Sequence, residues 1–162
     1  MIVLKVLAAL LTLFTARTVV LEYKKYTTRK LLLADGFCDL LSFIKGELSC
    51  RLRPVAEWAK EFHNAALSES GFLDELLKRG SLIDAFRLPS HSCLGEEMTR
   101  LLSGYFSSFG KTYKDEEEGE ACRVFDELMR LSARERADSQ RSLKTVRVIT
   151  YAVALGVIIL II

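Results

Sequence analysis

The chain has 162 residues, is 50% hydrophobic and carries a formal net charge of +2. This length is enough to bury one hydrophobic core. The small net charge hides a division, because acidic residues outnumber basic residues by seven between positions 31 and 129. Nucleic-acid binding requires a positive surface, so the acidic middle of the chain argues against a nucleic-acid partner.

Apolar segments lie at both ends of the chain. Residues 148–162 carry no charged side chain, and residues 1–21 are interrupted only by Lys5 and Arg17. A bilayer core of about 30 Å requires about 20 helical residues, and the second segment alone reaches only about 22 Å. The stem of Arg147 can extend that span, because it lies along lipid while its charge reaches the interface. The sequence therefore predicts two transmembrane helices, residues 1–21 and 148–162.

A cleaved signal peptide is the alternative interpretation of residues 1–21. The opening Met-Ile-Val-Leu lacks the basic start of a signal peptide. The Leu-Phe-Thr-Ala sequence before Arg17 is also a poor cleavage site. We therefore expect this helix to be retained.

Basic residues gather beside both apolar segments. Residues 22–30 form a basic juxtamembrane segment, and residues 132–147 form a basic stalk. Positive residues close to a span stay in the cytoplasm, so we expect a multi-pass protein of the cell membrane with a cytoplasmic body and both termini outside. The residues expected at the interface with the lipid bilayer are Arg17, Lys24, Lys25, Arg141, Lys144 and Arg147.

The body, residues 31–131, has helical periodicity throughout. The first apolar face consists of Phe37, Leu40, Leu41, Ile44 and Leu48. A second helix is predicted to start at Pro54 and to bury Val55, Trp58, Ala59 and Phe62. A short third helix is predicted to contain Phe72, Leu73, Leu76 and Leu77 and to end at Gly80. Ser81 and Asp84 resemble a capping box for a fourth helix that bears Leu82, Ala85 and Phe86.

Two longer helices are predicted after these. The fifth extends from Leu94 to Phe109 and ends at Gly110. Thr112 and Asp115 resemble the cap of the sixth, whose core face consists of Ala121, Val124, Phe125, Leu128 and Leu131. Nothing breaks this helix before the C-terminal span. The predicted fold class is all-α, a compact antiparallel helical bundle flanked by N- and C-terminal transmembrane helices. We expect the stalk to be helical. The alternative is a flexible segment at residues 132–142.

No arrangement of residues points to catalysis or to metal binding. The cysteines Cys38, Cys50, Cys93 and Cys122 are separated and form no metal-ligand spacing. His91 lies next to Ser92 and Cys93, but catalysis requires a base that is oriented toward the nucleophile by the fold. There is no glycine-rich phosphate loop. We expect no catalytic residue, no metal and no cofactor, and the sequence does not indicate an enzyme.

The order of several short motifs resembles the stage III sporulation protein AB family over nearly the whole chain. The resembling residues are Glu47-Leu48, Cys50, Pro54-Val55, Glu57, Gly80, Asp84-Ala85-Phe86, Phe109-Gly110, Thr112, Asp115 and Glu117. The departures from the family pattern are Cys50 in place of Tyr, Trp58 in place of Ala, Tyr113 in place of Asp and Glu117 in place of Gln.

This resemblance implies a role in assembly. Family members belong to a secretion-like channel between mother cell and forespore, and their soluble domain is similar to the cytoplasmic domains of the F-type platform protein of type II secretion and type IV pilus systems. The implied partners are a secretion-type ATPase, similar to stage III sporulation protein AA, and other membrane proteins of the channel. The alternative is a membrane-tethered adaptor or signalling module that is unrelated to sporulation. A membrane enzyme is a third and weaker alternative.

Two acidic clusters are the predicted partner-binding surface. They are expected to meet at one end of the bundle, around the turn at Gly110. The ordinary explanation of such clusters is that solvent-exposed acids cap helix N-termini. The cluster at residues 115–120, however, holds more acids than capping needs. The turn that contains Pro54 and Glu57 is the next candidate. The predicted contact residues in the two clusters are Glu96, Glu97, Asp115, Glu116, Glu117, Glu118 and Glu120.

Overall fold

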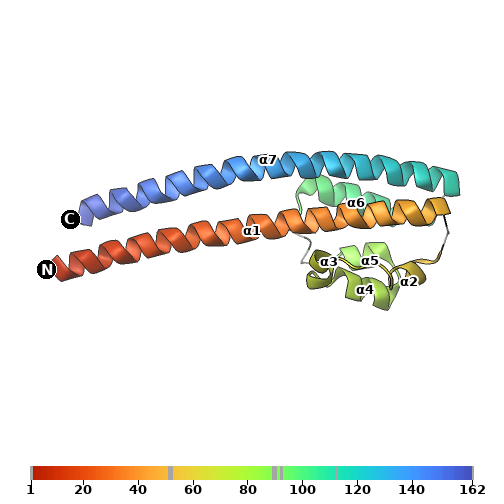
Figure 1. Cartoon of the computed structure of the whole chain (residues 1–162), viewed down its shortest axis with the longest axis horizontal. Helices are drawn as coiled ribbons and strands as arrows, with labels where there is room; N and C mark the ends of the chain where they lie inside the picture. Colours follow the sequence, from red (N-terminus) through yellow and green to blue (C-terminus); the bar gives the residue numbers. More distant parts are fainter. Residues whose placement is uncertain (1, 51–52, 89–90, 92, 112, 162) are drawn as a thin grey trace. The chain divides into compact units, whose positions relative to one another are not determined.

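The computed structural model describes residues 2–50, 53–88, 91, 93–111 and 113–161. Its regular elements within these ranges are helical and include no strand, so the all-α prediction is confirmed. The α-helices (Figure 1) are α1 (Ile2–Cys50), α2 (Val55–Trp58), α3 (Ala65–Glu69), α4 (Phe72–Arg79), α5 (Leu82–Phe86), α6 (Glu96–Ser108) and α7 (Lys114–Ile161).

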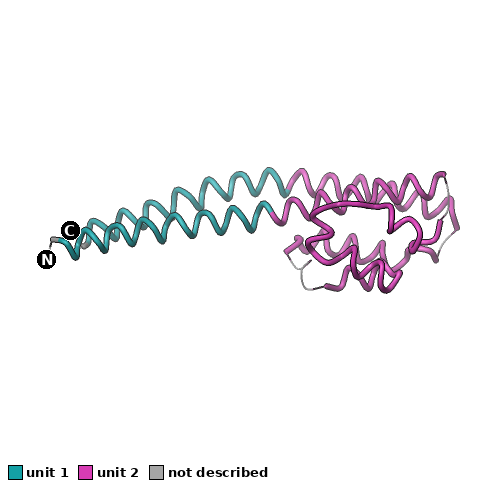
Figure 2. The backbone as a smooth tube through the Cα atoms, turned by 60° about the horizontal axis from the view of Figure 1, so that its bottom comes forward, with its two compact units in different colours: residues 1–28, 135–162 teal, residues 29–134 magenta. Residues whose placement is uncertain are grey.

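The chain divides into two compact units, which Figure 2 shows in different colours. The end unit consists of residues 1–28 and 135–162, and the body unit consists of residues 29–134. Both α1 and α7 contribute to each unit. Residues 132–147 are helical as part of α7.

In the end unit, α1 and α7 lie side by side and run in opposite directions (Figures 1 and 2). Each helix contains an 18-residue window with a mean hydropathy of 1.9, which is long and apolar enough to cross a membrane. Only 11% and 6% of these windows is buried, which is unlike the core helix of a soluble domain. The burial that does occur is at Ala16 and Val20 on α1 and at Ala154 on α7.

The core of the body unit is centred on α1. The residues predicted for its inner face, from Phe37 to Leu48, are all buried. The Phe37 ring contacts the rings of Phe72 on α4, Phe86 on α5 and Phe106 on α6, with centroid distances of 5.2–6.2 Å. On α7, the Phe125 ring lies 4.6 Å from Lys45 Nζ of α1. The C-terminal part of α1 therefore joins the short helices to α6 and α7.

His91 belongs to this core. Its imidazole is stacked on the Phe86 ring at 5.5 Å, and its nitrogens lie within hydrogen-bond distance of the Phe86 carbonyl oxygen and Ser70 Oγ. Burial lowers the pKa of this histidine and favours the neutral ring. The packing accounts for His91 as a structural residue.

Several local predictions are confirmed, and others are wrong. Gly80 ends α4 with a left-handed φ of 64°, and Ser81 Oγ accepts a hydrogen bond from the Asp84 N–H, as predicted. Leu77, one of the apolar residues of the predicted third helix, is 47% exposed. The predicted core residue Phe125 is only half-buried. The proposed cap at Thr112 lies outside the described residues.

The sequence analysis missed α3, which is a single short helix. Asn64 caps it, since its Oδ1 accepts from the Leu67 N–H at 3.1 Å, while its Nδ2 donates to Asp39 of α1 at 3.0 Å. Gly36 of α1 makes this approach possible. A Cβ at position 36 would lie 2.9 Å from Asn64 Oδ1 and 3.1 Å from Leu67 Cγ. The glycine that weakens α1 locally is therefore required where α3 packs against it.

We expect Gly36→Ala and Gly46→Ala to have opposite effects on stability. Both glycines are in α1, where alanine gains about 1 kcal/mol of helix propensity. At position 36 this gain is outweighed by overpacking, which costs about 1–3 kcal/mol. At position 46 no atom lies within 4 Å of the added Cβ, so the propensity gain remains. Thermal unfolding of the full chain in detergent, followed by circular dichroism, measures both shifts. Stabilisation by Gly36→Ala would contradict the described contact between α1 and α3.

Candidate functional site

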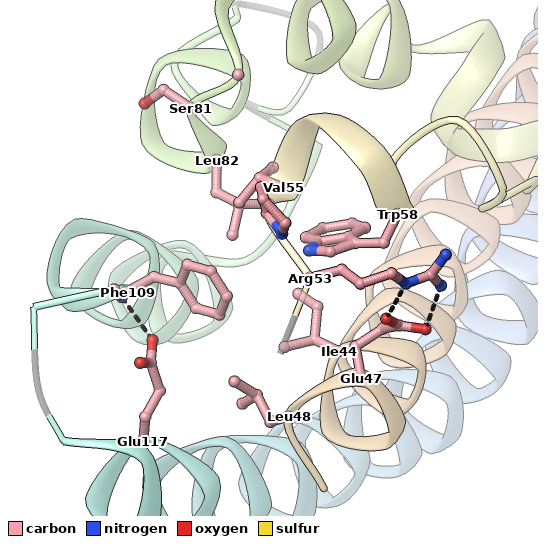
Figure 3. Close-up of a pocket in the computed structure, with 13 residues that line it drawn as sticks. Ile44, Glu47, Leu48, Arg53, Val55, Trp58, Ser81, Leu82, Phe109 and Glu117 are labelled. Atoms are coloured by element: carbon pink, nitrogen blue, oxygen red, sulfur yellow. Dashed lines mark hydrogen bonds and ion pairs between the residues drawn. The ribbon is translucent and has the colours of Figure 1, made fainter. Parts of the chain in front are cut away.

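The candidate site is an apolar pocket in the body unit with a volume of about 400 Å³. Three separate stretches of chain form it: the end of α1 with α2, the turn between α4 and α5, and the turn that precedes α7. Figure 3 shows these residues as sticks. The lining residues are Ile44, Glu47, Leu48, Arg53, Pro54, Val55, Trp58, Gly80, Ser81, Leu82, Phe109, Gly110 and Glu117.

The pocket has a buried apolar floor and an exposed rim. Trp58 is 2% exposed, and Leu48 and Leu82 are also buried. Figure 3 shows Trp58 and Phe109 on opposite sides of the space, with Leu48 beneath them. Pro54, Gly80 and Gly110 are exposed at the rim. A cavity with apolar walls and a few polar groups is typical of ligand and protein binding sites.

An ion-pair network fixes the wall that Arg53 forms. Arg53 donates through Nε and Nη2 to both carboxylate oxygens of Glu47 at 2.8 and 2.7 Å. It also donates to Glu61 at 2.5 and 2.9 Å. Hydrogen bonds to Glu47 and then Glu61 raise the pKa of Arg53, which stays charged. Arg53 is thereby held between two carboxylates.

Glu117 forms the opposite wall and closes the turn before α7. Its side chain is buried, and its Oε1 accepts a hydrogen bond from the Gly110 N–H at 2.5 Å. Gly110 has a φ of 77°, a left-handed conformation that glycine adopts without strain. This predicted contact residue therefore holds the turn in shape from inside the pocket.

The remaining acids of the cluster at residues 115–120 are of two kinds: two contact other side chains, and two are exposed. Glu118 accepts from Ser49 Oγ at 2.5 Å, and Glu120 is paired with Arg123. Asp115 and Glu116 are exposed and have no ion-pair partner among the described residues. These two carboxylates are the ones that a partner can reach without breaking an existing contact.

The expectation that the two acidic clusters meet is wrong. α6 runs opposite to the start of α7, because Gly110 after α6 contacts Glu117 while Glu97 at its beginning lies 3.9 Å from Arg134. Residues 118 and 134 are about 24 Å apart along a helix. Glu96 and Glu97 therefore lie far from the turn at Gly110. The other predicted pair fits the site better, because Pro54 lines the pocket and Glu57 is exposed on α2.

A more polar groove between α6 and α7 has mixed charge. Its volume is about 470 Å³. Ion pairs join three of its four lining arginines to glutamates, and the fourth is Arg100. The hydrogen bond from Arg123 lowers the pKa of Glu120. The groove therefore carries charges of both signs. The pairs are Arg123 with Glu120, Arg130 with Glu127 and Arg134 with Glu97.

The basic residues predicted at the bilayer interface are exposed in the end unit. These are Arg17, Lys24, Lys25, Arg141, Lys144 and Arg147. Lys25 forms a surface ion pair with Glu22 at 2.8 Å. Such pairs are worth little, so the lysine remains available to lipid headgroups. Within the described part of the chain, no group of three or more His, Cys, Asp or Glu residues could hold a metal ion.

Sequence reasoning missed most of the pocket. It identified Pro54 and Glu117 but assigned Trp58 and Leu82 to the core only. The signal that could have found the pocket is a pair of turn glycines, Gly80 and Gly110, each beside an apolar helix end.

No family model, curated protein or solved structure matches this chain.

We expect Glu117→Ala to destabilise the protein and Glu116→Ala to leave its stability nearly unchanged. Glu117 forms a charged hydrogen bond, and its loss costs about 1.5–3 kcal/mol. Glu116 is exposed, and substitutions at such positions usually stay within about 0.5 kcal/mol. Thermal unfolding of both variants in the same detergent provides the measurement. Equal stability of the two variants would show that Glu117 does not hold the Gly110 turn.

Proposed function

We propose that this chain is a non-enzymatic assembly factor in the cell membrane. In this proposal α1 and α7 both cross the bilayer, and the body unit projects into the cytoplasm as a compact antiparallel bundle. The factor docks a cytoplasmic secretion-type ATPase onto a secretion-like channel between mother cell and forespore. The sporulation context comes from the motif resemblance.

One observation carries this proposal. A folded body unit with its own core lies in the sequence between two helical ends that are long and apolar enough to span a membrane. Leu4, Leu7 and Leu160 are among the large side chains exposed on those ends, and such surfaces are stable in lipid. A body anchored at both ends is held at the membrane, where a soluble partner can be recruited.

The sidedness follows from the basic residues. Lys24, Lys25 and Arg147 lie next to the apolar segments on the side of the body unit in the sequence. Positive residues in such short flanks are retained in the cytoplasm. They also favour contact with anionic headgroups of the cytoplasmic leaflet.

The docking role is supported by the pocket. Its floor is apolar, and Asp115 and Glu116 are exposed beside its Gly110 rim. Buried aromatic and aliphatic pockets are where protein interfaces gain most of their binding energy. Exposed charges next to such a pocket contribute to association rate and specificity.

We expect the full chain to recruit an ATPase similar to stage III sporulation protein AA to membranes. Co-expression followed by membrane sedimentation measures the bound fraction, with membranes that lack the chain as the control. Recovery should fall as salt rises from low to physiological, because exposed charges are screened over about 8 Å. An ATPase that stays soluble under both conditions would contradict the proposed partner and favour the alternative of an adaptor unrelated to sporulation.

A further inference from the structure

We infer that Arg17, Lys24, Lys144 and Arg147 form one binding site for the headgroup of an anionic phospholipid. We call these four residues, which come from α1 and α7 of the end unit, the cationic face. The inference rests on the membrane anchoring in the proposed function. It goes beyond a general attraction of basic flanks to the bilayer, because it assigns the contact to four residues and excludes the other basic residues nearby.

The four residues lie at similar depths along the end unit. Figures 1 and 2 show that α1 begins at the end of this unit where α7 finishes. At a rise of 1.5 Å per residue, Arg17 and Lys24 lie about 24 and 35 Å from that end. Arg147 and Lys144 lie about 22 and 27 Å from it. All four are therefore at the boundary between the apolar segments and their basic flanks.

Burial shows which faces of the two helices are in contact. The end unit contains only parts of α1 and α7, so each helix is buried there by the other. The buried residues are Ala16 and Val20 on α1 and Ser139 and Ala154 on α7. The centre of each pair of buried positions gives the direction in which that helix faces its neighbour.

The cationic face lies on one side of this helix pair. Successive residues of a helix are rotated by about 100°. Relative to the centre of the buried face, Lys24 and Arg17 are rotated by about 60° and 80° on α1. On α7, Arg147 and Lys144 are rotated by about 50° and 110° in the same sense.

The same rotational sense means the same side because the helices are antiparallel (Figure 1). A half-turn about an axis perpendicular to their common plane exchanges two antiparallel helices. This half-turn leaves each side of the plane where it was, so equal rotations on the two helices place side chains on one side. The four cations are thus gathered by the pairing of the helices.

No acid balances the cationic face. Its four side chains are exposed, and they form no ion pair within the part of the chain that the structure describes. Glu22 is rotated by about 140° in the opposite sense and is paired with Lys25. Lys25 and Arg141 are rotated by about 160° and 170°, so they point away from the neighbouring helix.

The surface beside the cationic face favours a lipid over a soluble phosphate. Toward the ends of the chain, the same side of the pair carries the exposed side chains of Leu10, Leu13 and Tyr151. Acyl chains can pack along this apolar strip while the headgroup phosphate contacts the cations. Arginine donates bidentately to phosphate, and lysine adds a compact positive charge.

Native mass spectrometry of the full chain in a neutral detergent measures this binding. The chain is titrated with phosphatidylglycerol or phosphatidylcholine of the same acyl chains, and the fraction that carries one lipid is recorded. We expect phosphatidylglycerol to bind at least about fivefold more tightly. Soluble glycerol phosphate in about tenfold excess should not displace it, because it buries no acyl chain. Equal affinity for the two lipids, or full displacement by glycerol phosphate, would overturn the inference.

Two double variants test whether both helices contribute to one site. Lys144→Gln with Arg147→Gln removes two cations from α7, and Arg17→Gln with Lys24→Gln removes two from α1. Each should lower the affinity for phosphatidylglycerol about fivefold or more. Unchanged affinity, or a loss confined to the variant of one helix, would rule out a shared site.

A third double variant separates a defined site from general charge attraction. Lys25→Gln with Arg141→Gln removes the same charge from the outward positions of the same two helices. It should change the affinity for phosphatidylglycerol less than about twofold, because neither residue belongs to the cationic face. A loss as large as that of the other two variants would overturn the inference.

The outcomes separate this inference from the proposed function. If phosphatidylglycerol is preferred as expected and the ATPase stays soluble, the lipid site stands and the docking function fails. If the ATPase is recruited to membranes and the two lipids bind equally, the docking function stands and the lipid site fails.

Discussion

Burial of one face of α1 is the constraint on which the body unit depends. Phe37, Leu41 and Ile44 are almost completely inaccessible to solvent, and they belong to one buried cluster with residues of all the later helices of that unit. The short helices α2–α5 are four to eight residues long, too short to be stable alone. They persist because Phe72, Phe86 and their neighbours pack on this face. Large-to-small changes here cost about 3–5 kcal/mol.

The pocket is located where this face of α1 ends. Leu48 belongs both to the core and to the pocket floor, and Pro54 lines the same pocket. The Arg53 network and the Glu117–Gly110 hydrogen bond hold the surrounding turns open. Stability and binding are thereby linked: the interactions that terminate the core also shape the apolar opening. The proposed docking site uses apolar surface that the fold itself leaves uncovered.

The helices and their inner faces could be predicted from the sequence, because apolar spacing and capping residues are local signals. The face from Phe37 to Leu48, the end of α4 at Gly80 and the cap at Ser81 were predicted in this way. The position of Glu97 could not be predicted, because it depends on α6 running opposite to α7. The close approach at Gly36 and the α3 cap at Asn64 likewise depend on contacts between distant segments.

The central claim is that a cytoplasmic body is anchored by two membrane-spanning ends, and site-specific labelling tests it most directly. Single cysteines replace Ser68 or Ser107, both exposed in the body unit, in a chain whose four native cysteines are changed to alanine. The account predicts that a membrane-impermeant thiol reagent labels neither position in intact cells and labels both after permeabilisation. Efficient labelling of either position in intact cells would contradict it.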